Sequence, residues 1–250
     1  MKKIVLGFCI LLCTPFLGAQ NLSGIIQYAE SIKIEFKMEG ADAEQFINLI
    51  PKEQKTKKSL VFNESASLYK NIEEANDDVI EQESNGMAIK IKIDKPKDII
   101  YCDFKNDLRW EQREFMTRLF LIESTVSHKD WKMTGNQKMI MGYPCQEATR
   151  TIDDKKIMAW FTPAIPLSYG PGSITGLPGL VLLVDINDGE QIITAENIEL
   201  KTIDQKELIK PKEGKKVSRE EFKKIVDEKM KEMKEENGGG GNNIIIKMRK

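Results

Sequence analysis

The sequence predicts a β-rich α+β fold: a curved antiparallel meander sheet, or a partly open barrel, with a C-terminal helix packed on it. Short segments in which apolar and polar residues alternate run through most of the chain, and turn residues separate them. One amphipathic helix pattern follows them near the end. Nothing in the middle has the composition of a linker, so residues 20–236 are expected to form a single domain.

The first half of the chain supplies five of these alternating segments. Strands are expected at 23–28, 31–36, 60–62, 67–69 and 88–93. Residues 41–50 interrupt the pattern with apolar residues at helical spacing ahead of Pro51. Asn85 and Gly86 predict a hairpin, because both residues tolerate a positive φ.

The second half continues in the same way. Residues 98–123 predict two or three further strands, with a helix at 109–115 as the alternative. Strands at 179–185 and 191–194 come next. Hairpin tips are expected at 134–137, 153–155 and 187–189, where Gly, Asn and Asp gather. Short polar turns of this kind favour an antiparallel meander.

A helix is predicted at about 218–236. Ser218 and Glu221 have the spacing of a capping box, in which each side chain accepts a hydrogen bond from the other residue's backbone N–H. The apolar residues that follow share one helix face, which would lie across the sheet: Phe222, Ile225, Val226, Met230 and Met233. The alternative is a solvated charged tail. Residues 237–250 are expected to be a Gly-rich flexible tail in which 244–246 either add a strand or are disordered.

The N-terminus has the pattern of a signal peptide. Lys2 and Lys3 precede an apolar run at 4–13, and small residues at 17–19 offer a cleavage site before Gln20. The run is shorter than the roughly 20 residues that span a bilayer. We therefore expect residues 1–19 to be removed, and a mature protein in the periplasm or secreted, with no transmembrane anchor after cleavage.

Charge excludes one class of partner. The chain has 38 basic and 39 acidic residues, and loss of Lys2 and Lys3 would leave a net charge near −3. The charges are interspersed rather than blocked. This balance lacks the basic patch that a nucleic-acid-binding protein needs, so no nucleic acid is expected as a partner.

Two cysteines, Cys102 and Cys145, would remain after cleavage. In an oxidising compartment they could form a disulfide, which would contribute roughly 2–4 kcal/mol. The alternative is that each is a small buried hydrophobic residue. Sequence alone does not show whether their Cα atoms approach closely enough to be bridged.

Several motifs in the second half resemble those of the GLPGLI family. Residues 176–181 read Gly-Leu-Pro-Gly-Leu-Val, with Val181 where the family usually has Ile. Residues 142–149 resemble its G-Y-x-C-x-x-A-T strand, and 159–166 its A-W-[YF]-T-x-x-I-P stretch, while Gly170-Pro171 is similar to its G-P pair. The resemblance implies an exported Gram-negative envelope protein with a compact β-rich body and no established catalytic residues.

The Gly- and Pro-rich loop at 169–176 is the candidate binding surface. Its glycines permit positive φ and leave backbone N–H groups open to a ligand. The alternative is that the loop only turns a corner beneath a tight sheet. The candidate binding residues are Trp160, Tyr169, Gly170, Pro171, Gly172, Gly176, Leu177, Pro178 and Gly179.

No catalytic motif is recognisable. His128 is the single histidine, which excludes multi-histidine zinc sites and H-E-x-x-H proteases. Residues 185–190 resemble a calcium loop, but Gly189 is fifth where such a loop needs glycine sixth. We therefore expect no catalytic residue, no metal and no cofactor.

These observations favour a non-enzymatic binding or accessory protein whose partner is an apolar small ligand or another envelope component. One alternative is a periplasmic hydrolase that uses carboxylates such as Asp153, Asp154 or Glu147, brought together by folding. Another is a structural module that docks on an outer-membrane transporter or secretion component. An enzyme requires two acids that converge in a cleft, whereas a binding protein requires an apolar concavity.

Overall fold

The computed structural model describes residues 22–38, 51–72, 78–84, 87–93, 98–126, 130–152, 154–237 and 244–248. Most of these residues are in β-strands. The main-sheet strands are β1 (Gly24–Met38), β2 (Glu53–Phe62), β3 (Ala66–Asn71), β6 (Ile99–Asp103), β7 (Leu108–Phe115), β8 (Arg118–Thr125), β9 (Lys132–Ile140), β10 (Tyr143–Ile152), β11 (Lys155–Thr162), β12 (Leu180–Ile186), β13 (Gln191–Leu200), β14 (Lys215–Val217) and β15 (Ile244–Met248). The other elements are β4 (Asp78–Ser84), β5 (Met87–Ile93), the 3₁₀ turn η1 (Gln205–Glu207) and helix α2 (Arg219–Asn237).

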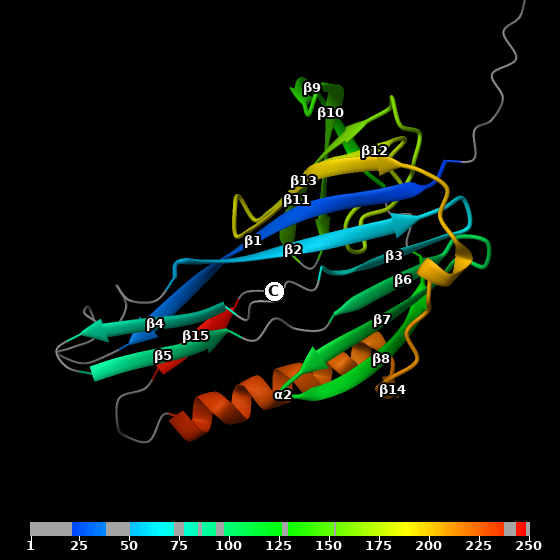
Figure 1. The fold of residues 1–250 in the computed structure, drawn as a ribbon. Helices are drawn as coiled ribbons and strands as arrows, with labels where there is room; N and C mark the ends of the chain where they lie inside the picture. Colours follow the sequence, from blue (N-terminus) through cyan, green and yellow to red (C-terminus); the bar gives the residue numbers. More distant parts are fainter. Residues whose placement is uncertain are drawn as a thin grey trace, which may run out of the picture.

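The sheet is open and almost wholly antiparallel. Its order is β14-β8-β7-β6-β3-β2-β1-β13-β12-β11-β10-β9, with β15 paired to β1 and a separate β4–β5 ribbon. Among the described strands, β14 and β8 form the one parallel pair. The sheet curves strongly, so that β9 and β10 run across the direction of β1 and β2 (Figure 1). The predicted β-rich fold is confirmed in its open form, because β14 and β9 end the described sheet without pairing to each other.

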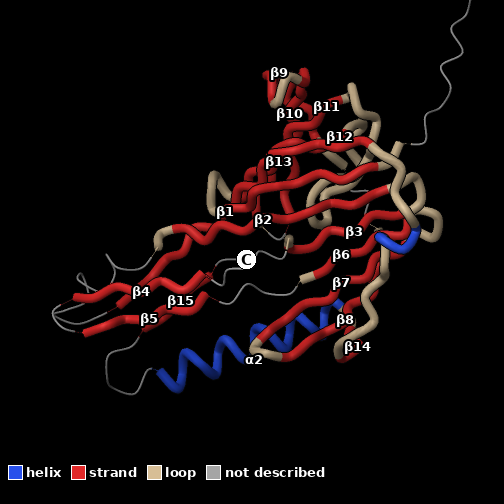
Figure 2. The backbone as a smooth tube through the Cα atoms, in the orientation of Figure 1, coloured by secondary structure: helices blue, strands red, loops and turns tan. Residues whose placement is uncertain are grey.

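Both faces of the sheet bury apolar side chains. The larger core lies on the inner face and includes Tyr28, Phe62 and Phe161, all inaccessible to solvent. A smaller cluster on the outer face forms where the segment after β13 crosses β2 and β3, with Ile203 and Leu208 packed on Val61 and Leu68. In Figure 2 this segment is a loop that contains the short helical turn η1 and runs past the ends of the strands.

Most expected strands are confirmed, with two differences. Segments 23–28 and 31–36 form the single long strand β1, in which a register shift at Gln27/Tyr28 takes the place of a turn. The predicted hairpin tip at 134–137 is wrong, because these residues lie inside β9 and the turn is at 141–142. Gly135 does have a positive φ, of 86°, as expected for a glycine in a turn, but it lies within a β-bulge.

The remaining predictions concern the strands at 98–125 and the hairpin tips. Residues 98–125 form three strands, and 109–115 is a strand rather than the alternative helix. The hairpin tips at 153–155 and 187–189 are confirmed by the pairing of their flanking strands. Strands β4 and β5 likewise pair on either side of 85–86. The predictions for residues 1–19, for 41–50 and for His128 lie outside the described residues.

The C-terminal helix is confirmed together with its capping box. The Ser218 backbone N–H donates to Glu221 Oε2 at 2.7 Å, and the Glu221 N–H donates to Ser218 Oγ at 3.0 Å. The Phe222 ring packs edge-on against Phe115 and Phe120, with ring centroids 6.5 and 5.3 Å away. Thus the first turns of the helix dock on the sheet.

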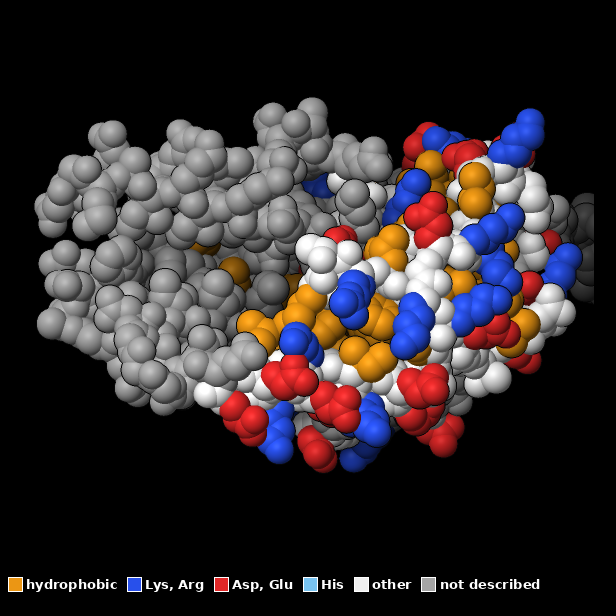
Figure 3. Space-filling view, turned by 90° about the horizontal axis from the view of Figure 1, so that it is seen from below, with side chains coloured by type: hydrophobic (Ala, Val, Ile, Leu, Met, Phe, Trp, Pro, Cys, Tyr) orange, Lys and Arg blue, Asp and Glu red, His pale blue; other side chains and the backbone are white. Residues whose placement is uncertain are grey.

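Farther along α2 the apolar face is less covered, and Met233 is 40% exposed. Seen from below, hydrophobic side chains gather between charged ones on this side of the molecule (Figure 3). Residues 244–248 are not a free tail, because they pair with β1 as β15. Within the described residues, no helix combines the length and apolar character needed to cross a membrane.

Candidate functional site

The Gly- and Pro-rich loop is built into the core. Ile165, Leu167, Ile174 and Leu177 are all buried in the inner cluster. The N–H groups of two of its glycines are engaged: that of Gly170 donates to the Ile174 carbonyl at 2.8 Å, and that of Gly176 donates to the Ser168 carbonyl at 3.0 Å. These amides are not open to a ligand, so the loop geometry fits the corner-turning alternative.

Individual residues of the loop agree with this. A Cβ on Gly179 would lie 2.2 Å from the Thr162 carbonyl oxygen, and one on Gly170 would lie 2.8 Å from Val181 Cβ. The Tyr169 ring stacks on Phe104 with centroids 3.5 Å apart. Pro171 is buried, and the buried Leu177 lies between the exposed residues Gly176 and Pro178. Gly172, with a φ of 65°, faces open space, because no atom lies within 4 Å of the position that a Cβ would take.

Both cysteines are free thiols in the inner core. Burial raises the pKa of Cys102 to about 11. Burial also raises the pKa of Cys145. Each therefore stays protonated at neutral pH and unreactive as a nucleophile.

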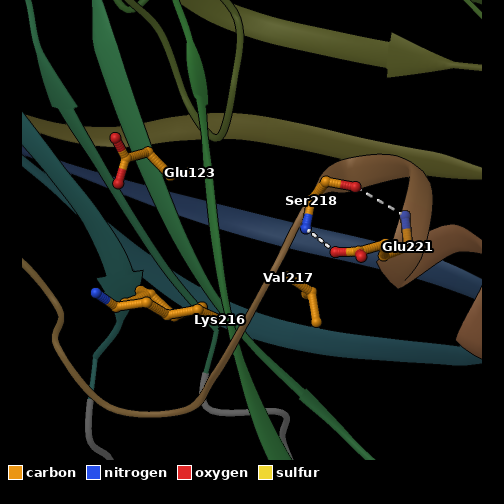
Figure 4. Close-up of a pocket in the computed structure, with 6 residues that line it drawn as sticks. Glu123, Lys216, Val217, Ser218 and Glu221 are labelled. Atoms are coloured by element: carbon orange, nitrogen blue, oxygen red, sulfur yellow. Dashed lines mark hydrogen bonds between the residues drawn. The ribbon is translucent and has the colours of Figure 1, made fainter.

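A shallow pocket of about 330 Å³ lies where β8, β14 and the start of α2 meet (Figure 4). Ser218 and Glu221 contact each other across its rim through the capping box. Glu123 accepts a hydrogen bond from the Trp110 indole at 3.0 Å. Since both carboxylates of the pocket hold structural elements in place, we do not assign it a catalytic role.

A network of charges is buried on the inner face. Glu111 on β7 is 1% exposed and forms ion pairs with three arginines: Arg109 at 2.9 Å, Arg113 at 3.0 Å, and Arg219 of α2. Arg113 also pairs with Asp98 at 2.7 Å. Burial alone would raise the pKa of Glu111, but the three guanidinium groups together lower it below its usual value.

Glu147 on β10 forms a different kind of site. At the β9 bulge, Gln146 pairs with Gln137 and Ala148 with Met133, so residues 134–136 lie opposite Glu147. The bulge aims two donors at one carboxylate oxygen: Thr134 Oγ1 and Asn136 Nδ2 both donate to Glu147 Oε2 at 2.6 Å. Glu147 is 6% exposed, and no cation pairs with it in the part of the chain that the structure describes.

An aromatic ring adjoins this carboxylate. Trp160 on β11 is the cross-strand partner of Glu147, so the two side chains leave the same face of the sheet. The Lys138 ammonium nitrogen lies 4.1 Å from the centroid of the Trp160 ring, which is 8% exposed. A carboxylate, an amide, a hydroxyl and an indole thus meet within three neighbouring strands.

Of the three carboxylates suggested for a hydrolase, only Glu147 lies in such a site. Asp154 is exposed at the tip of the β10–β11 hairpin, and Asp153 lies outside the described residues. Across the described ranges, no three metal-ligating side chains gather closely enough to hold a metal ion. The sequence contains one signal for this site, because Thr134 and Asn136 flank a glycine, a residue type that tolerates positive φ. In the structure the φ of Gly135 is indeed positive.

Comparisons with known proteins point in one direction. The family model described as "N-glycanase peptide, N-terminal domain" matches residues 72–224, which is more than half of the chain. Two solved structures of PNGF-II have the same fold, with TM-scores of 0.51 and sequence identities of 15% and 16%. Each match covers 82% of this chain but only 33% and 32% of PNGF-II, so the chain spans about a third of that protein's length. No curated protein matches the sequence.

These findings correct the sequence-based identification. The GLPGLI resemblance is wrong, because the matching family model is that of the N-glycanase domain. The Gly and Pro residues that suggested the GLPGLI family are required by local packing. Gly179, for example, packs so closely on the Thr162 backbone that no side chain fits there. A short motif that satisfies local packing can recur in unrelated families.

The expectation of a non-enzymatic binding or accessory protein is wrong for a related reason. It depended on the absence of a catalytic motif, whereas the matching family model is that of the N-terminal domain of an N-glycanase. Functional groups such as Glu147 and Asn136 come together only through the β9 bulge. A search for motifs along the sequence does not detect such a site.

Proposed function

This chain belongs to the family of the N-glycanase N-terminal domain, and from that premise we propose that it takes part in the enzymatic removal of N-linked glycans from glycoproteins. The contact with the glycan is assigned to the face around Glu147. The observation that carries this assignment is the Glu147 carboxylate, which is fixed by two neutral donors and has no cation partner among the described residues.

The chemistry of this face suits a sugar. Carboxylate and amide groups exchange hydrogen bonds with sugar hydroxyls. A carboxylate neutralised by an arginine would have less capacity to accept such bonds, as at Glu111. Only Oε2 of Glu147 is occupied by the hydrogen bonds to Thr134 and Asn136, so Oε1 is left to accept from a ligand.

Cleavage itself requires more than one group. In the described residues, no second acid makes contact with the Glu147 cluster. We therefore assign substrate contact to Glu147 and place bond cleavage with groups beyond this cluster. Export by the signal-like segment at 1–19 would bring the protein to secreted glycoproteins.

The test uses the full chain and a glycopeptide that carries one N-linked high-mannose glycan. Calorimetry measures its binding, with the same peptide lacking the glycan as control, and mass spectrometry measures released glycan. We expect glycan-dependent binding that weakens at least tenfold in Glu147→Gln, because the amide that replaces the carboxylate accepts hydrogen bonds more weakly. The matched control is Glu199→Gln, an exposed carboxylate on β13.

The possible outcomes separate binding from cleavage. Glycan release by the chain alone would place the whole activity in it, whereas binding without release would assign cleavage to a separate catalytic part. If the chain neither bound the glycopeptide nor released its glycan, the proposal would be contradicted. Equal weakening in the Glu147 and Glu199 variants would remove the site assignment.

A further inference from the structure

Arg150 lies on the same strand as Glu147 but on the opposite, inner face of the sheet. Its guanidinium carbon is 4.2 Å from the centroid of the Trp131 ring, a stacked cation–π contact. The Trp131 indole N–H donates to the Thr175 carbonyl at 2.9 Å, which fixes the ring. Arg150 is therefore held by an aromatic surface, and no acid of the described residues pairs with it.

This arginine lacks the partners that its neighbours have. Arg109 and Arg113 pair with Glu111, and Arg113 pairs also with Asp98. By contrast, Arg150 Nε is completely buried and has no hydrogen-bond partner in the described part of the chain. Buried polar groups in proteins are normally satisfied, so an orphaned guanidinium N–H indicates a missing acceptor.

The surroundings of Arg150 are electropositive. Burial lowers the pKa of Arg150, and the positive charge of Arg109 lowers it further. Glu111 is already shared among three arginines and has no free capacity for a fourth. Glu111 therefore does not supply the hydrogen-bond acceptor that the Arg150 Nε–H lacks.

We propose that Arg150, stacked on Trp131, is a binding site for an oxyanion, either free or carried by an acidic sugar as a carboxylate or sulfate group. A guanidinium group presents two parallel N–H donors along one edge, which match the two oxygens of such an anion. The acidic-sugar part rests on the proposed role in glycan processing. The oxyanion part does not.

The test is calorimetric titration of the full chain with sodium N-acetylneuraminate and, separately, sodium sulfate at low ionic strength. N-acetylglucosamine is the neutral control sugar. We expect millimolar or tighter binding of an anion, weakened at least tenfold in Arg150→Gln. Lys132→Gln, which removes an exposed cation from β9, should change the affinity less than twofold.

A second measurement covers the case in which Arg150→Gln fails to fold. In the unmodified protein, the Arg150 Nε–H resonance should shift on addition of the anion, because Nε gains its acceptor. Tighter binding of N-acetylneuraminate than of sulfate would support the acidic sugar, whereas equal binding would limit the site to free oxyanions. Absence of binding by both anions, or equal loss in the Arg150 and Lys132 variants, would overturn the proposal.

Discussion

Arg219, the first residue of helix α2, donates a hydrogen bond to Glu111, which lies 108 residues earlier in strand β7. Glu111 is 1% exposed, whereas Arg219 is half-exposed on the helix. The contact joins the C-terminal helix to the inner face of the sheet and completes a cluster with Arg109 and Arg113. One carboxylate thus pairs with three guanidinium groups, so the network depends on Glu111.

Replacing Glu111 by Gln should destabilise the protein by roughly 3–5 kcal/mol. The change leaves the buried Arg109 without a carboxylate and leaves Arg113 with Asp98 alone, and removal of one partner from a buried ion pair has an effect of this order. Urea unfolding followed by tryptophan fluorescence measures it. Glu228→Gln is the control, because its pair with Lys224 is exposed and its loss should change the unfolding free energy by less than about 0.5 kcal/mol. Equal effects in the two variants would contradict the central place of Glu111.

The same carboxylate predicts how stability changes in acid. The folded-state pKa of Glu111 is lowered, so its contribution is complete above the unfolded pKa of about 4.3 and is lost as pH falls through the folded value. We expect the urea midpoint of the wild-type protein to decrease as the pH falls below about 5. The decrease should be smaller in Glu111→Gln, which has no proton to gain at this position. Parallel curves for the two proteins would contradict the prediction.

Helix docking predicts a contrast between two residues on the apolar face of α2. Phe222→Ala should destabilise the protein by about 2 kcal/mol, because the ring packs on Phe115 and Phe120 but is only half-buried. Met233→Ala should change stability by less than about 0.5 kcal/mol, since Met233 is 40% exposed. Thermal unfolding followed by circular dichroism measures both. A similar loss in each variant would indicate that the whole helix face is buried.

Local patterns in the sequence predict most of the strands and the helix. Alternation identifies β5, a continuous apolar run identifies β12, and the Ser218–Glu221 spacing locates the start of α2 within one residue. Strand order is not predicted in this way, because β1 lies between β2 and β13, which are far apart in the sequence. Those pairings depend on long-range burial, which a local pattern does not encode.

The candidate sites are less predictable for a related reason. Strand β7 carries Arg109, Glu111 and Arg113 at alternate positions, where a half-buried strand would normally direct apolar residues to the core. Their ion pairing, and the role of Arg219, become visible only in three dimensions. The Glu147 site likewise depends on a bulge whose glycine suggested a turn.

Gly172 in the Gly- and Pro-rich loop and Gly179 just after it distinguish packing from ligand binding. Gly179→Ala should unfold the protein or destabilise it severely, because the added Cβ would lie 2.2 Å from the Thr162 carbonyl oxygen. Gly172→Ala should lower stability by only about 1 kcal/mol, which is the cost of a left-handed φ for a residue with a side chain, since open space surrounds that position. Chemical unfolding gives both values. If Gly179→Ala folded normally but lost binding to the N-linked glycopeptide, the loop would be a binding surface after all. If Gly172→Ala lowered the unfolding free energy more than Gly179→Ala, the corner would not depend on the close packing of Gly179.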